Sequence, residues 1–141
     1  MNHTTNYNLP QWEDGDRVTR GDFNDAMSAI DGAIKAVSDN VPGIVIGTYT
    51  GNGEESQDIN LGFQPKAVLV THSTGTIFHY INVPLFNGGL AMRGNPAKLS
   101  TYNILTVTST GFRVYCHYIS GSNTYINSNA NTNTYYYIAF K

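Results

Sequence analysis

The sequence has few charged residues, and this scarcity narrows the classes of partner that it predicts. Charged side chains make up 13% of the 141 residues, and the formal net charge is −2. Proteins that bind nucleic acid or an anionic membrane surface usually carry clusters of lysine and arginine. We therefore expect no nucleic acid binding. The sequence also lacks an apolar run of about 18 residues, so we expect no membrane insertion.

The single cysteine, Cys116, excludes an internal disulfide framework. It lies in the alternating run RVYCHYI, where it is predicted to be a small buried hydrophobic residue rather than a nucleophile. No basic and then apolar segment typical of a secretory signal is present at the N-terminus. We therefore expect a soluble protein that is made in a cytoplasm and needs no oxidation to fold.

Signatures of catalysis are lacking as well. No G-x-S-x-G motif occurs, and Cys116 and His117 are neighbours in a predicted strand, so their side chains point to opposite faces. Hydrolysis of a polysaccharide would need two facing carboxylates. The acids after residue 43 gather instead around one turn, at Glu54, Glu55 and Asp58. We expect a protein that is not an enzyme, and a hydrolase is the least favoured reading.

The histidines do not predict a metal site within one chain. His72 and His79 are separated by a predicted turn, and their spacing is not that of a known metal-binding module. If three copies assembled around an axis, one histidine from each copy could meet there, and this alternative stays open. The chain alone indicates neither a metal nor another cofactor.

Asparagine, glycine and tyrosine take the place of charged residues. The sequence contains 16 asparagines, 14 glycines and 10 tyrosines. Such residues make neutral hydrogen bonds and offer aromatic faces, which suits sugars and protein docking better than ionic ligands. They also suit a sheet protein whose turns are built from asparagine and glycine.

Residues 22–40 predict a helix with a heptad seam. The bulky apolar residues recur at steps of 4, 3, 4 and 3, with isoleucine in the middle, and this pattern favours bundles of three or more helices over pairs. An ordinary amphipathic helix lying on its own domain is the alternative, because about two heptads are short for a coiled coil. We predict a trimerisation stem, capped by Thr19 or Asp22. Its seam residues are Phe23, Met27, Ile30, Ile34 and Val37.

Residues 1–21 form a polar arm before this helix. Pro10 disfavours a regular element there, so the arm alone is expected to be flexible. Tyr7 and Trp12 are isolated aromatic residues in this polar segment, and such residues commonly anchor a segment onto a partner or a neighbouring element. The pattern favours an attachment arm.

From residue 44 onward the hydrophobic period changes from helical to alternating. A Gly/Asn turn at 50–56 predicts one hairpin, and the turn at 109–111 predicts another. The segments 84–100 and 120–134 are predicted to be loops, although GGLAMR could hold a short strand. The predicted fold is mainly β, with an antiparallel β-sandwich over residues 44–141. Its predicted strands are 44–50, 56–62, 66–73, 76–81, 103–109, 112–119 and 134–140.

Candidate ligand-binding residues lie at strand ends and in the two predicted loops. A sugar site combines an aromatic face with amide, imidazole or guanidinium groups that pair with hydroxyls. Nine residues supply this mixture, although each one alone is also explained as an ordinary turn or strand residue. They are His79, Tyr80, Asn82, Arg93, Asn95, His117, Tyr118, Asn123 and Tyr125.

The last predicted strand separates its residues into two faces. Alternation places Tyr136 with Ile138 and Phe140, and we expect this set in the core. Tyr135 and Tyr137 would then face outward. Because tyrosine is favoured at interfaces, we predict that these two contact a neighbouring subunit.

Residues 6–34 resemble the N-terminal segment of tail-fibre-like proteins of phages and prophages. In those proteins a Y-N-L-x-Q-W stretch precedes a short helix with D-F-N and I-D-x-A motifs. The resemblance implies that residues 1–21 attach to baseplate or tail proteins. The matching residues are Tyr7-Asn8-Leu9, Gln11-Trp12, Asp22-Phe23-Asn24, Ile30-Asp31 and Ala33.

The sequence after residue 44 is similar in layout to H-type lectin-like heads. The matching segments are 62–68, 107–112 and 137–139, with Tyr137 where the family has tryptophan. The resemblance implies a trimer with a sugar site between subunits. That site uses residues matched by His117 and Tyr118, together with an arginine that 101–106 lacks.

Pattern and resemblance together predict a homotrimeric phage tail-fibre or receptor-binding protein. It would be made in the bacterial host cytoplasm and carried on the virion, and its lectin-like heads would bind a host surface glycan. The alternative is a structural virion decoration or baseplate adaptor protein without glycan binding.

Overall fold

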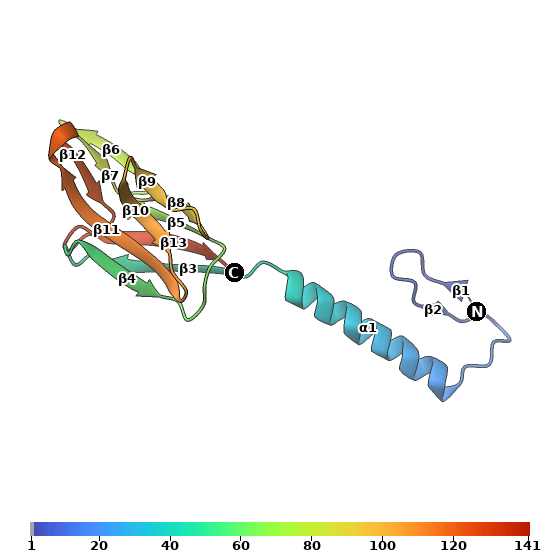
Figure 1. Cartoon of the computed structure of the whole chain (residues 1–141). Helices are drawn as coiled ribbons and strands as arrows, with labels where there is room; N and C mark the ends of the chain where they lie inside the picture. Colours follow the sequence, from blue (N-terminus) through green and yellow to red (C-terminus); the bar gives the residue numbers. More distant parts are fainter. Residues whose placement is uncertain (1) are drawn as a thin grey trace. The chain divides into compact units, whose positions relative to one another are not determined.

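A computed structural model describes residues 2–141, and Met1 of the predicted arm lies outside the described residues. The chain divides into two compact units, one ending at Val41 and the other spanning Pro42–Lys141. The protein is mainly β, as predicted. The helix α1 (Arg20–Asn40) is followed by the strands of a β-sandwich (Figure 1).

The first unit begins with a small hairpin. β1 (Asn2–His3) and β2 (Pro10–Gln11) pair in antiparallel fashion. The Thr4 amide donates to the Leu9 carbonyl at 2.9 Å, and the Leu9 amide donates to the Thr4 hydroxyl at 3.0 Å. The expectation of an arm without regular structure is therefore wrong. Pro10 is tolerated because it is the first residue of an edge strand, where it need not donate.

A capping box starts α1. The Asp22 amide donates to the Thr19 hydroxyl at 3.2 Å, and the Asp22 carboxylate accepts from the Thr19 amide at 2.9 Å. These hydrogen bonds from Thr19 lower the pKa of the Asp22 carboxyl. Thr19, one of the two predicted caps, is the N-cap, and the helix begins at residue 20 rather than 22. It ends at Asn40, because a residue before Pro42 avoids the helical conformation.

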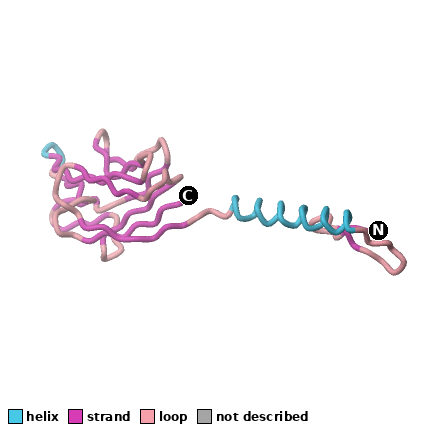
Figure 2. The backbone as a smooth tube through the Cα atoms, turned by 90° about the horizontal axis from the view of Figure 1, so that it is seen from below, coloured by secondary structure: helices cyan, strands magenta, loops and turns pink. Residues whose placement is uncertain are grey.

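The second unit consists of two packed sheets, which Figure 2 shows as strands and loops with a single 3-10 turn, η1 (Ser120–Ser122). Its strands are β3 (Ile44–Thr50), β4 (Ser56–Asn60), β5 (Ala67–His72), β6 (Phe78–Ile81), β7 (Val83–Phe86), β8 (Gly89–Met92), β9 (Ala97–Leu99), β10 (Tyr102–Val107), β11 (Gly111–Ile119), β12 (Thr124–Asn127) and β13 (Thr134–Phe140). The four-stranded sheet has the order β3-β13-β5-β8. The seven-stranded sheet has the order β6-β7-β12-β11-β10-β9, with β4 on β11, and it curls into a half-barrel.

The pairing confirms one predicted hairpin and contradicts the other. β10 and β11 pair as expected, with Leu105 opposite Val114. β3 and β4 belong to different sheets, because β3 pairs with β13 and β4 pairs with β11. The turn between β3 and β4 therefore carries the chain across the sandwich. The segment predicted as the loop 84–100 contains β8, β9 and most of β7.

Aromatic rings fill the space between the sheets. Tyr49 and Tyr135 stack at 5.0 Å between ring centroids, and Phe112 meets Tyr49 edge-on at 5.9 Å. Val70 and Leu105, from opposite sheets, are also fully buried in this core. Removing such surfaces from water is the main driving force that holds the sandwich together.

The two faces of β13 are the reverse of the prediction. Tyr135 is fully buried in the core, and Tyr137 packs against the same core above Gly47 on β3. A side chain at Gly47 would collide with the Tyr137 ring, so glycine makes room for it. Tyr136 is exposed instead. The prediction that Tyr135 contacts a neighbouring subunit is therefore wrong, because its own head already covers it completely.

Candidate functional site

Strands of the half-barrel bring three of the predicted ligand residues into one row. Tyr118 on β11 lies opposite Tyr125 on β12, Tyr125 lies beside Leu85 on β7, and Leu85 lies opposite His79 on β6. Residues opposite one another on neighbouring strands project from the same face of a sheet. The row therefore presents two tyrosines and a histidine on one face, with Leu85 between them.

The Tyr118–Tyr125 pair is open to solvent. Its ring centroids lie 4.6 Å apart, and the side chains expose 46% and 38% of their surface. The Tyr118 hydroxyl donates to the Asn123 carboxamide oxygen at 2.9 Å. The pair therefore combines aromatic surface with a hydroxyl and an amide, which is the mixture that a sugar ring requires.

The backbone explains why an asparagine stands beside this pair. Asn123 follows η1 and adopts the left-handed conformation, with φ of 49°. Asparagine tolerates this conformation better than most residues, because its short side chain can form local hydrogen bonds. The β11–β12 turn thus fixes the carboxamide next to Tyr118.

The other face of these strands forms a hollow of 570 Å³. Phe78 and Phe86 line one side of it, Leu99 and Tyr102 line another, and serine and threonine hydroxyls contribute the polar part. No charged side chain lines this hollow. Its chemistry therefore suits a neutral ligand with a substantial apolar surface.

His117 borders a second, smaller hollow of 210 Å³. Its ring stacks on Tyr102 at 4.6 Å between centroids, and Tyr102 lines both hollows. Glu55 supplies a carboxylate to the smaller hollow. Because side chains alternate along a strand, His117 projects from the face of β11 opposite to Tyr118. His117 and Tyr118, which the resemblance to lectin-like heads placed in one sugar site, therefore belong to different surfaces.

Arg93 and Asn95 lie in the turn after β8, at the edge of the four-stranded sheet. One Arg93 guanidinium nitrogen donates to the Gln64 carbonyl at 3.1 Å, and Met92 and Asn95 exchange backbone hydrogen bonds of 2.9 Å. These contacts hold the turn and belong to a different sheet from the tyrosine pair. Arg93 therefore does not share a cleft with His117 or Tyr118.

Tyr80 and Asn82 belong to the β6–β7 hairpin. Tyr80 lies opposite Pro84, on the face of β6 opposite to His79. Asn82 has a φ of 66° and forms the hairpin turn. The nine predicted residues therefore do not form one site. His79, Tyr118, Asn123 and Tyr125 are the predicted residues that share one surface.

Sequence reasoning missed the aromatic lining of the larger hollow. Phe78 and Tyr102 occupy alternating runs, so periodicity could have placed them on a common face with their strand neighbours. Phe86 and Leu99 could not be found this way. They lie on strands of four and three residues, within a segment whose glycines and prolines predict a loop.

A second surface is the outer face of the four-stranded sheet. The register aligns two rows of four apolar residues across all four strands. Ile46, in the first row, exposes 72% of its surface, and Met92, in the second, is also exposed. Monomeric proteins rarely leave such a continuous apolar patch in water. The rows are Ile46, Ile138, Leu69 and Leu90, then Ile44, Phe140, Ala67 and Met92.

The seam of α1 is a third uncovered surface. Phe23, Met27, Ile34 and Val37 are exposed, and Ile30 is half-buried. On this helix, Ala26 is the buried residue among those described. The seam therefore remains available to another helix with the same heptad spacing.

Comparison of the chain with protein-family models, curated proteins and solved structures found no match in any of the three. The function is therefore argued from the surfaces themselves. Within residues 2–141, no group of three or more histidine, cysteine, aspartate or glutamate side chains is placed to hold a metal ion. Among the same residues, no helix combines the length and the apolar character that crossing a membrane requires.

The one exposed ion pair of the head lies apart from the tyrosine row. Arg113 on β11 makes a two-pronged contact with Asp58 on β4, with both N–O distances at 2.7 Å. The Arg113 hydrogen bonds lower the pKa of the Asp58 carboxyl. The charges of Arg113 and Asp58 are therefore paired with each other. The tyrosine surface offers a ligand aromatic stacking and neutral hydrogen bonds.

Proposed function

We propose that the chain is a homotrimeric receptor-binding protein of the phage tail-fibre type, whose three heads bind a glycan on the host cell. The arm attaches the trimer to the tail or baseplate, and α1 bundles the three chains. The protein is carried on the virion after synthesis in the host cytoplasm.

The observation that carries this proposal is the separation of the two kinds of surface on the head. The apolar rows lie on the outer face of the four-stranded sheet, whereas Tyr118 and Tyr125 lie on the other sheet. Copies that cover the apolar rows leave the tyrosine pair open. Assembly and ligand binding therefore do not compete for the same residues.

The shallow tyrosine surface fits weak binding by each head. Two exposed rings and one amide give a sugar little enclosure, and enclosure is what tight small-molecule sites rely on. Three heads on one stem raise the overall affinity, because the second and third contacts form at a high effective concentration. Attachment to a surface that repeats the same glycan requires only such weak single contacts.

The test combines light scattering with a glycan array. We expect the mass of a trimer, and binding to a subset of neutral glycans that the double variant Tyr118→Ala/Tyr125→Ala reduces by about tenfold or more. Tyr80→Ala is the matched control, because Tyr80 is also an exposed tyrosine of the same sheet but lies outside the pair. A monomer without glycan binding would sink the proposal.

A trimer that binds no glycan would support the alternative function, a virion decoration or baseplate adaptor. In that case the same variants should instead weaken binding to a tail or baseplate protein. A pull-down from purified phage particles, with wild type and the Tyr118→Ala/Tyr125→Ala variant side by side, separates the two functions.

A further inference from the structure

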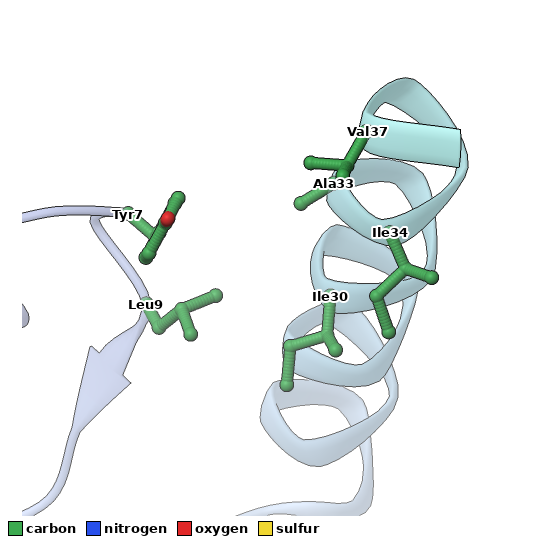
Figure 3. A pocket seen from close by; sticks show the side chains of 6 residues that line it. All are labelled: Tyr7, Leu9, Ile30, Ala33, Ile34 and Val37. Atoms are coloured by element: carbon green, nitrogen blue, oxygen red, sulfur yellow. The ribbon is translucent and has the colours of Figure 1, made fainter. Parts of the chain in front are cut away.

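The arm and α1 enclose an apolar groove of 300 Å³ (Figure 3). Tyr7 and Leu9 from the arm face Ile30, Ala33 and Val37 of the helix across it. The lining is apolar apart from the tyrosine hydroxyl. Water gains few hydrogen bonds against such a lining.

The arm closes on itself through its own hydrogen bonds. The hairpin of β1 and β2 is closed by the paired hydrogen bonds between Thr4 and Leu9. This local structure presents Tyr7, which exposes 72% of its surface, and Leu9 on the side that faces the groove. Two apolar side chains are therefore held out in position with no partner filling the space before them.

The helical wall of the groove identifies its occupant. Ile30, Ile34 and Val37 line the groove, and the same three residues belong to the heptad seam. Whatever covers the seam must therefore enter the groove. The partner of a heptad seam is another helix of matching period, and in a homotrimer that helix is α1 of a neighbouring copy.

From this shared lining we infer that the arm of each chain acts as a strap, which means that it packs on the helix of a neighbouring copy and holds the stem together. The seam side chains of a neighbouring α1 enter the groove, and Tyr7 and Leu9 pack on that neighbour from outside. The inference rests on the proposed trimer and adds a role for the arm within it. A stem of about two heptads, too short to be stable alone, then gains an additional contact from every chain.

Photo-crosslinking tests which chain the arm touches. The full-length protein carries the photo-crosslinker p-benzoylphenylalanine in place of Tyr7, and isotopically labelled and unlabelled chains are denatured, mixed and refolded together. Crosslinked peptides that join a labelled to an unlabelled chain can arise only between copies. We expect such mixed peptides to connect position 7 to α1. The same group in place of Thr5, which is exposed but does not line the groove, is the matched control.

Mixed crosslinks to α1 from position 7 but not from position 5 support the strap. Crosslinks confined to single chains, or equal yields from both positions, overturn it. Light scattering on the same samples keeps the two proposals apart, because a trimer without mixed crosslinks contradicts only the strap. A monomer contradicts the proposed trimer itself.

Hydrogen exchange gives a second readout that does not depend on the crosslinker. Leu9→Asp should speed the exchange of α1 amides by about tenfold or more, because local opening becomes easier when a contact is lost. Thr5→Asp should leave the exchange unchanged. Equal exchange in both variants and in the wild type would contradict the strap.

Discussion

At the scale of single residues, the polar segment 127–130 holds the sandwich closed. The Tyr49 hydroxyl donates to the Ser128 carbonyl at 2.5 Å, and the Ser128 hydroxyl donates to the Ile104 carbonyl at 2.6 Å. Asn129 is fully buried, and its carboxamide donates to the Glu54 carbonyl at 2.9 Å. Residues 127–130, which composition predicts to be a polar loop, therefore join strands and turns through buried hydrogen bonds.

Asn129→Ala should destabilise the head by about 2–4 kcal/mol, because it removes three side-chain hydrogen bonds of a fully buried residue, each worth about 1 kcal/mol net. Two of these bonds join Asn129 to Asn52, whose backbone amide donates at 3.2 Å and whose side-chain oxygen accepts at 2.7 Å. Urea unfolding at fixed protein concentration measures the loss. Asn131→Ala, at an exposed position in the same run, should change the free energy of unfolding by less than about 0.5 kcal/mol. Equal effects of the two variants would show that the buried hydrogen bonds carry no special weight.

Burial raises the pKa of the Cys116 thiol. The thiolate is the reactive form, so a raised pKa leaves less of it at neutral pH, and the fraction grows only as the pH rises. We expect Cys116 to react with a disulfide reagent more slowly than free cysteine at pH 7.5. Unfolding the protein in urea should restore the ordinary rate. An equally fast reaction in the folded protein would contradict this prediction.

At the scale of elements, strong periodicity was the reliable signal. The helix and the long strands β3, β5, β11 and β13 lie close to their predicted positions. The short strands β7, β9 and β12 were missed because three or four residues cannot establish a period against glycine, proline and asparagine, whereas β8 lies in the GGLAMR run that allowed a short strand. Period alone also could not tell the two faces of β13 apart. Tyr135 lies on one face and Ile138 on the other, so both faces carry large apolar side chains.

The stem variant Ile30→Asp/Ile34→Asp tests how the helix and the heads share the assembly. We expect the helical circular dichroism signal to fall, because four added charges per pair of facing helices cannot be buried at the seam. Light scattering should still report a trimer, since the apolar rows of the heads remain intact. Ser28→Asp, an exposed change off the seam, is the control. A stable monomer with folded heads would mean that the helix is the principal contact.

At the scale of the whole molecule, the proposed association of the heads rests on the outer face of the four-stranded sheet. Ile46→Lys should separate the heads, because burying an unpaired lysine in each subunit costs about 2 kcal/mol or more. The single head should keep its melting temperature, since Ile46 is exposed there. Sedimentation of the isolated Pro42–Lys141 unit, with Thr110→Lys as the control, checks both statements. If Ile46→Lys heads sediment like those of the wild type, the apolar rows are not the contact.

The candidate site was only partly predictable at this scale. Four of the nine predicted residues share a surface, and their side chains are aromatic, imidazole and amide groups. Which strands become neighbours depends on pairings far apart in the sequence, such as Tyr125 beside Leu85. Local patterns carry no information about such pairs. Arg93 was one of the nine predicted residues, yet its guanidinium donates to the Gln64 carbonyl at the edge of the other sheet.

The central position of β13 also sets the order in which the head can form. β13 pairs with β3 on one side and β5 on the other, and it follows both of them in the chain by more than sixty residues. On a ribosome, β3 therefore has no strand to pair with until β13 has been synthesised, while the apolar residues of β3 and β5 already face water. Such long-range pairing slows folding and leaves aggregation-prone apolar strands exposed until folding is complete. The yield of soluble protein should therefore depend on growth temperature and chaperone supply more steeply than its folded stability alone would suggest.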